Sequence, residues 1–367
     1  MTTTIDSLTS ERFDVEGYYE LLDLLEARSL TDGLPIVPPT PELVATFVEA
    51  SGLDPQVSFG AIPPAMGNAT VEKIAVNAVM AGCRPEYMPL LVDAVALLQE
   101  PEFKLLSVQT TTHPCAPMLL VHGPQAARLG INGGPDAFAP GNRANATIGR
   151  AIRLVLLCVG GALPGRGDRS TQGTPAKYTY CIAENEAETP WEPLRVAQGY
   201  TEQDSVLTIA ALEAPHNIND HGATAGEEVL TTIAGAMAQA GANELLLERP
   251  NPFLFLGPEH AQLIAAAGFG RADVQEFIFQ KARVPAERVG RGQRAWLYVF
   301  HESLANRVEL GLDRTDAKEY PVIARPEQLT VVVVGGPGMH SAWGSSFGTV
   351  PAVSRRLGSP AAVQSTV

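Results

Sequence analysis

The sequence predicts an α/β protein with a mixed, largely buried sheet that is built from pseudo-repeated helix–strand units. Helical patterns alternate along the chain with short apolar runs, which is the order expected of this fold class. Two phrases recur in these patterns, one ahead of helices and one behind strands, and recurrence of this kind predicts repeated structural units.

The first phrase is a short polar stretch that leads into an amphipathic helix. Apolar residues behind the first two copies recur at i, i+3, i+4, i+7 and i+8, which is the spacing of a buried helical stripe. Asn or Thr in each copy can cap the free N–H groups of the helix that follows. The copies are GNAT (67–70), ANAT (144–147) and a weaker GAT (222–224), ahead of helices predicted at 71–83, 148–161 and 225–241. We therefore expect three units, starting near residues 67, 144 and 222.

The second phrase is an apolar strand followed by Gly-Pro and a short helix. It occurs at 118–124 and 253–258, and 331–338 resembles it. Short β-rich runs predict further strands at 178–183, 205–210, 244–247 and 295–300. A helix and a proline-rich arm, LPIVPPTPE, make up residues 1–60. We expect the arm to wrap the core of a single domain at 61–358 or a neighbouring subunit, in a possible homo-oligomer, and 359–367 to form a flexible tail.

Composition excludes several classes of partner. The formal net charge is −14 and the pI is about 5.0, so no basic stripe is available for nucleic-acid phosphates. The longest apolar run, 154–163, is too short to cross a bilayer, and residues 1–14 lack the features of a secretory signal. The four cysteines form no CxxC pair. We therefore expect a cytoplasmic protein without a nucleic-acid or membrane partner.

Four polar clusters interrupt the apolar pattern at strand ends or helix starts, where α/β proteins place their chemistry. They are TTTHPC (110–115), GNRAN (141–145), YCIAENE (180–186) and HNINDHG (216–222). The last is read as a loop that feeds a helix N-terminus, which favours anions. If the repeated units pack around a pseudo-axis, these loops would converge on one pocket.

Three chemistries could use these residues, and the sequence leaves them open. A divalent metal (zinc, copper, iron or manganese) could bind His113, His216 and His221, because imidazole is a common ligand and catalytic ions often use three protein ligands. Without a metal, a histidine could act as acid or base. In a thiol mechanism, His113 would activate Cys115, because residues two apart on a strand share a face.

The remaining candidates serve substrate binding or orientation. Arg143 could bind a carboxylate or phosphate through two parallel hydrogen bonds, with Asn145 beside it. Glu184 would orient a histidine or take a proton. The expected pocket walls include Asn217, Asn219, His340 and Ser341. His122 lies within a predicted strand and is expected to be a hydrogen-bonded core histidine. No nicotinamide or nucleotide motif is complete in the chain.

Several phrases together resemble a bacterial protein family known mainly as hypothetical proteins. The phrases are TDGLPIVPPT (31–40), ATVEKIAVNAVMAGCRPEY (69–87), TTHP (111–114), GNRANATIGRA (141–151), KYTYCIAENE (177–186) and HNINDHG (216–222). Some members look linked to a UGSC-motif domain of selenoprotein or thiol-redox type. This chain contains no GSC segment, and the resemblance implies no reaction that could be carried over.

These observations lead to the expectation of a cytoplasmic enzyme of small-molecule metabolism. It would catalyse a lyase or hydrolase step on a small polar, anionic substrate, with metal-assisted or histidine acid–base chemistry. The alternatives are a non-catalytic ligand-binding subunit and a thiol-based redox enzyme that uses Cys115.

Overall fold

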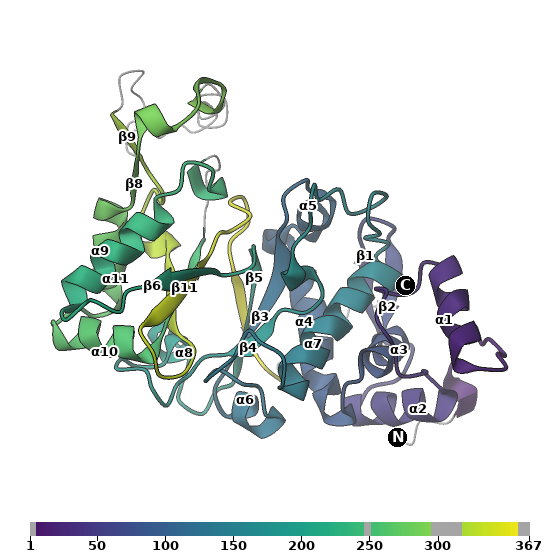
Figure 1. Ribbon diagram of the computed structural model, residues 1–367. Coiled ribbons are helices and arrows are strands. Elements are labelled where there is room, and N and C mark those ends of the chain that lie inside the picture. Colours follow the sequence, from purple (N-terminus) through teal and green to yellow (C-terminus); the bar gives the residue numbers. More distant parts are fainter. Residues whose placement is uncertain (1–4, 246–250, 295–317, 359–367) are drawn as a thin grey trace.

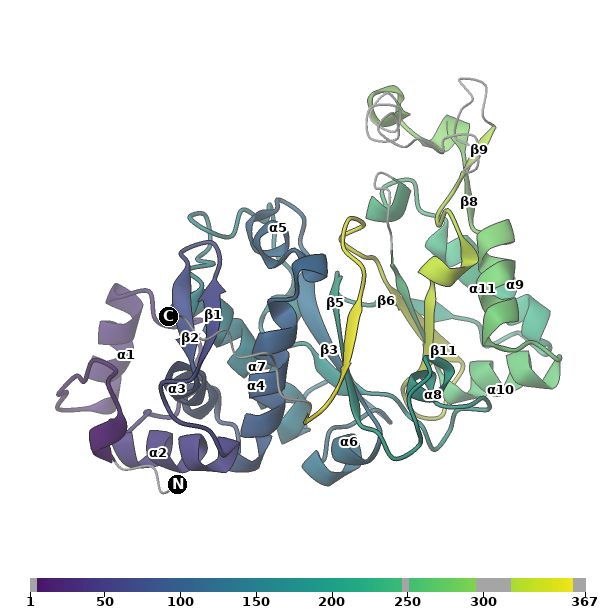
Figure 2. The same cartoon turned by 180° about the vertical axis from the view of Figure 1, so that it is seen from behind.

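The computed structural model describes residues 5–245, 251–294 and 318–358, and it has an α/β architecture (Figure 1). Two four-stranded sheets lie side by side at the centre, and helices cover the outer side of each (Figures 1 and 2). The strand predicted at 295–300 and the tail predicted at 359–367 lie outside the described residues. No helix within those ranges is both long and apolar enough to cross a membrane.

The first sheet has the strand order β12-β5-β3-β4, and the second has the order β6-β11-β7-β10. In each order the first two neighbouring pairs are antiparallel and the last is parallel. The strands are β3 (Ala116–His122), β4 (Cys181–Ala183), β5 (Val206–Leu212), β6 (His216–Asn219), β7 (Phe253–Leu256), β10 (Thr330–Val333), β11 (His340–Gly344) and β12 (Val353–Arg356). Two small hairpins complete the strands: β1 (Ser58–Ile62) with β2 (Gly67–Thr70), and β8 (Arg283–Pro285) with β9 (Glu319–Pro321).

The chain passes from one sheet to the other twice. The chain leaves β5 in the first sheet and next forms β6 in the second, and it leaves β11 in the second sheet and next forms β12 in the first. A backbone bridge between Leu212 and Ser346 joins the two crossings. The first sheet therefore contains β12, which follows all four strands of the second sheet along the chain.

The helices form the outer layers. One group of helices lies on the side of the first sheet. It consists of α1 (Tyr18–Ala27), α2 (Pro41–Ser51), α3 (Val71–Ala81), α4 (Met88–Leu98), α5 (Leu105–Thr110), α6 (Pro124–Leu129) and α7 (Arg143–Leu154). The second sheet carries α9 (Gly226–Met237), α10 (Pro258–Ala266) and α11 (Arg271–Lys281), and the single turn α8 (Leu194–Ala197) lies near it.

Alternation along the strands explains why both faces of each sheet are buried. Met118 and Leu120 of β3 pack with Phe253 and Phe255 of β7 in one cluster between the sheets. The intervening residues, such as Leu119 of β3, belong to the cluster beneath the helices. Successive side chains of a strand point to opposite faces, so a continuous apolar run can fill two layers at once.

The predictions made from the two recurring phrases are confirmed at some copies and wrong at others. Strand, Gly-Pro and helix follow one another as predicted at β3–α6 and at β7–α10, whereas β10 is followed by β11 without a helix. Thr70 caps α3 as predicted, through a hydrogen bond from the N–H of Lys73. The prediction for the second copy was wrong: α7 begins at Arg143, is capped by Asn142 and holds the ANAT residues in its first turns.

Two further local predictions are corrected. Residues 216–219 were expected in a loop but form β6, because their backbone pairs with β11. In the run at 244–247, which was expected to be a strand, residues 244 and 245 belong to the 3₁₀ turn Asn243–Leu245, and 246 and 247 lie outside the described residues. In the proline-rich arm, Ile36 is buried and the N–H of Val37 donates to Met80 O at the end of α3.

Candidate functional site

Several of the residues expected at the site meet at the open edge of the second sheet. A pocket of about 400 Å³ lies there, and we call it the histidine pocket. Its lining includes Asp136, Phe138, Asn217, Gly335, His340 and Ser341. The volume falls within the range of small-molecule sites in proteins.

Two exposed imidazoles stand together here: His340 lines the pocket, and His221 lies beside His340. His340 Nδ1 lies 3.0 Å from Asn217 Oδ1, and His221 Nδ1 makes a short hydrogen bond with Asn219 Oδ1. The two rings meet edge to face with their centroids 4.9 Å apart. An amide oxygen only accepts hydrogen bonds, so both contacts favour the imidazole tautomer with a proton on Nδ1. Each Nε2 is then left with a lone pair for a substrate proton.

The register of β6 and β11 creates this arrangement. Asn219 lies opposite His340 and Asn217 lies opposite Ala342 in the antiparallel pair. Residues two apart on a strand share a face, and directly paired residues do too, so both amides and the imidazole of His340 face the same way. The intervening Ser341 faces the helices instead, and its Oγ contacts His260 Nδ1 at 2.8 Å.

Glycines let the pocket walls approach one another. A Cβ added at Gly336 would lie 2.5 Å from Pro135 Cγ, and one added at Gly133 would lie 2.5 Å from Ala183 O. At Gly257 an added Cβ would overlap His340 O. The loop that carries Asp136 and Phe138 can therefore pack directly onto the segment that precedes β11.

Asn145 supports this wall rather than facing a substrate. Its side chain is buried, accepts from the N–H of Asn132 and donates to the carbonyls of Asn132 and Ala137. Arg143 likewise donates to Gly82 O and Cys83 O, the carbonyls that follow α3. Both residues were expected to hold an anion, but their polar groups serve the fold.

The other predicted histidines lie apart from the pocket. His216 is paired with Trp343, and alternation along β6 places its side chain on the face opposite that of Asn217. His113 Nε2 lies 2.6 Å from Glu213 Oε1, and its ring stacks on Phe347. The three proposed metal ligands, His113, His216 and His221, do not form a ligand group among the described residues.

Cys115 is buried and precedes β3, which begins at Ala116. The expectation that Cys115 and His113 share a face of one strand was therefore wrong. Burial raises the pKa of its thiol to about 12. A thiolate is the reactive form of cysteine, and this environment opposes its formation.

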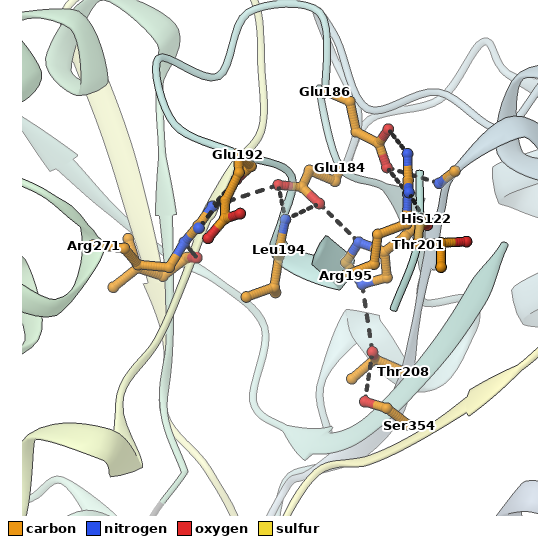
Figure 3. A network of polar contacts seen from close by, with 12 residues as sticks. His122, Glu184, Glu186, Glu192, Leu194, Arg195, Thr201, Thr208, Arg271 and Ser354 are labelled. Carbon is orange, nitrogen blue, oxygen red and sulfur yellow. Dashed lines mark hydrogen bonds and ion pairs between the residues drawn. The ribbon is translucent and has the colours of Figure 1, made fainter. Parts of the chain in front are cut away.

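Within the described ranges, one group of three side chains could approach a metal ion: His122, Glu184 and Glu186, whose ligand atoms lie within 4.8 Å of one another. Figure 3 shows that these atoms already have partners. Glu184 Oε2 lies 2.8 Å from His122 Nδ1, and both carboxylate oxygens of Glu184 accept from the N–H of Leu194.

Charge in this cluster is balanced by the chain itself. Arg195 donates to both carboxylate oxygens of Glu186 at 3.0 Å, and Arg271 Nη2 lies 3.8 Å from Glu184 Oε1. Two carboxylates thus face two guanidinium groups in a largely buried place. A divalent ion would have to displace Arg195 and would leave excess positive charge without water, which is costly. The residues present therefore fit a structural network and not a metal centre.

The sequence predicted only part of the role of Glu184. It was expected to orient a histidine, and it contacts His122, whose identity as a buried, hydrogen-bonded core residue is confirmed. His122 ends β3 and Glu184 follows β4, and these strands are parallel neighbours. Carboxyl ends of parallel strands meet at one edge of a sheet, but the pairing of two short runs is not visible in the sequence. Glu186 stands in the polar cluster 180–186, which interrupts the apolar pattern of the sequence, whereas Arg195 carried no signal beyond its charge.

No protein-family model matches the chain, and no curated protein matches it.

Proposed function

We propose that the protein is an enzyme of small-molecule metabolism that catalyses a lyase or hydrolase step by histidine acid–base chemistry in the histidine pocket. The observation that carries this proposal is the contact between His221 and His340, each held through Nδ1 by an asparagine oxygen. Acid–base steps need a group that gives a proton beside one that takes it.

The pair can supply both groups. The ring centroids lie 4.9 Å apart, so one substrate can contact both imidazoles. A neutral ring offers Nε2 as a base, and a ring that carries both protons offers one of them and a positive charge for a substrate oxyanion. The amide Nδ2 of Asn217, on the pocket wall, is a further donor for that oxygen.

The structure's geometry favours this mechanism over the two other chemistries. The metal alternative lacks a third ligand beside His221 and His340, because among the described residues only the charge-balanced cluster at His122 brings three potential ligand atoms together. The thiol alternative requires a thiolate at Cys115, which its burial opposes. A non-catalytic binding subunit would use the same pocket, and turnover decides between the two functions.

The test is a search for turnover with a matched set of variants. The purified protein is incubated with pools of small polar acids, and their consumption is followed by mass spectrometry for wild type, His221→Ala, His340→Ala and His216→Ala. Loss of an acid–base group costs roughly 10²–10⁴-fold in rate. We expect such a loss in the first two variants and a near-wild-type rate in His216→Ala, which removes an imidazole from the other face of the same strand.

Two outcomes would contradict the proposal. A substrate turned over equally well by the His221→Ala, His340→Ala double variant would remove the imidazole pair from the mechanism. Compounds that bind in the histidine pocket of wild type and are never converted would assign the protein to the class of binding subunits.

A further inference from the structure

A second and larger pocket lies where α8, β10 and the start of α11 meet, and we call it the α11 pocket. Its volume is about 720 Å³, and it shares no lining residue with the histidine pocket. Its lining includes Trp191, Leu194, Arg271, Gln275, Leu329 and Val331. Neither the proposed acid–base step nor the charge-balanced cluster requires a cavity of this size.

Arg271 is held rigidly at this pocket with part of its donor set still available. Its side chain is only 11% exposed. Nε donates to Val331 O at 3.0 Å, and Nη1 and Nη2 each donate to Glu192 O at 3.1 Å. These bonds use one N–H on each nitrogen, three of the five that a guanidinium carries. Nη2 also lies 3.8 Å from Glu184 Oε1, so the second N–H of Nη1 is the donor left for a ligand that enters the pocket.

An aromatic ring stands beside this guanidinium. The Arg271 Cζ atom lies 5.6 Å from the ring centroid of Trp191, and the indole N–H of Trp191 donates to Phe269 O at 3.1 Å. That hydrogen bond fixes the ring in the pocket wall. Leu194, Leu329 and Val331 are buried and add apolar surface to the same lining.

The inner side of the pocket carries a buried cation, Arg271, whose charge Glu184 partly balances from 3.8 Å away. Gly270 and Ala272 line the pocket at the N-terminus of α11, an 11-residue helix whose dipole places partial positive charge there. The acidic lining residues Glu192 and Glu327 have exposed side chains, so they can turn toward solvent at the rim. The buried cation of the lining is thus Arg271.

We propose that the α11 pocket binds a small carboxylic acid with a flat, aromatic or otherwise planar body. The carboxylate would accept from the remaining N–H of Arg271 Nη1, and the planar body would lie against Trp191 among the apolar side chains. A hydrogen bond between a charged donor and a carboxylate is shorter and stronger than one between neutral groups. This site is separate from the histidine pocket and does not depend on the function proposed for it.

The test follows the indole ¹⁵N–¹H signal of Trp191, assigned by its loss in Trp191→Phe, while the whole protein is titrated with four probes. Benzoate carries both the ring and the charge, benzamide the ring alone, benzylamine the ring with opposite charge, and inorganic phosphate an anion without a ring. We expect benzoate to shift the signal with saturation in the millimolar range, and the other three to bind at least about tenfold more weakly.

Variants locate the charge that is recognised. In Arg271→Gln the benzoate affinity should fall about tenfold or more, and Arg271→Lys should restore only part of it, because a lysine keeps the charge but not the hydrogen bonds to Val331 O and Glu192 O that hold the guanidinium in place. Lys281→Gln, at the far end of the same helix, should bind benzoate as wild type does. Should Arg271→Gln fail to fold, the comparison of benzoate with benzamide in wild type still decides the proposal.

The proposal is overturned if benzoate leaves the Trp191 signal unmoved. Equal binding of benzamide would remove the role of Arg271, and equal binding of phosphate would remove the role of the planar body. None of these results depends on turnover, so they leave the function proposed for the histidine pocket to its own test.

Discussion

His340 Nδ1 and Asn217 Oδ1 lie 3.0 Å apart although 123 positions separate the two residues in the chain. The contact crosses from β11 to β6, the edge strand that follows directly after a strand of the other sheet. Pairing of these two strands within the second sheet thus creates the orientation of an imidazole at the histidine pocket. That relationship can be tested without knowledge of a substrate.

Replacing Asn217 with Leu removes the acceptor at similar side-chain volume. We expect the Nδ1–H tautomer of His340 to lose its preference, which long-range ¹⁵N–¹H spectra of the imidazole report directly. Since Asn217 is exposed, the free energy of unfolding should change by no more than about 0.5 kcal/mol. Asn217→Asp keeps an oxygen acceptor and should keep the tautomer. An unchanged spectrum in Asn217→Leu would show that the amide does not orient His340.

Gly257→Ala tests the close packing beneath the same histidine. The added Cβ would overlap His340 O, so a backbone shift is required, and overpacking of this kind costs about 1–3 kcal/mol. Gly235→Ala is the matched control, since an added Cβ there has no atom within 4 Å and the residue lies on the exposed side of α9. It should stabilise the protein by about 0.5–1 kcal/mol. Denaturant titration of both variants measures the difference, and equal stabilities would contradict the packing argument.

Glu184→Leu tests whether the cluster around His122 holds the fold. The change leaves His122, the N–H of Leu194 and Arg271 without their shared partner in a buried place. Removal of one member of a buried ion pair costs about 3–5 kcal/mol. Glu188→Leu changes an exposed carboxylate four residues away and should stay within about 0.5 kcal/mol of wild type. A loss below about 1 kcal/mol in Glu184→Leu would show that this network contributes little to stability.

Glu244 predicts a pH dependence of stability. Burial raises the pKa of this carboxyl from 4.5 to about 7, against hydrogen bonds from Ser345 and Ser346 that lower it. The folded state then binds the proton more tightly than the unfolded state, so the stabilisation is full below pH 4.5 and is lost as the pH rises through 7. At about 1.4 kcal/mol per pKa unit the loss is on the order of 3 kcal/mol.

Denaturant titrations at several pH values between 4.5 and 8 measure this dependence. The side chain introduced by Glu244→Gln cannot ionise. The free energy of unfolding of this variant should therefore lack the loss, on the order of 3 kcal/mol, that wild type shows as the pH rises. Parallel pH profiles for the two proteins would show that Glu244 does not titrate differently on folding.

The cysteines give a simple probe of the thiol alternative. Burial raises the pKa of Cys83, Cys115 and Cys158 to about 12, and it also raises that of Cys181. We expect iodoacetamide at pH 7.5 to label none of the four in the native protein within the time that labels all of them in denaturant. Rapid native labelling of Cys115, located by peptide mass spectrometry, would revive a thiol mechanism.

Local predictions succeeded where the signal lies within a few residues. Thr70 at the start of α3 is an example, because a cap and a helical stripe are features of neighbouring positions. The same reasoning failed for the ANAT copy, since Asn142 offers an equally good cap three residues earlier and α7 begins there. It also failed for residues 216–219, whose strand exists only because β11 lies beside it.

By itself the sequence determined the α/β class, the turns in which Gly-Pro joins β3 to α6 and β7 to α10, and the polar segments that carry His221 and His340. Only the tertiary structure decided which histidines meet. Strand pairing brings His340 to Asn217, whereas it turns His216 to the other face and leaves His113 with Glu213. The physical reason is that hydrophobic periodicity specifies which face of an element is buried but not which strand, far away in the chain, becomes its neighbour.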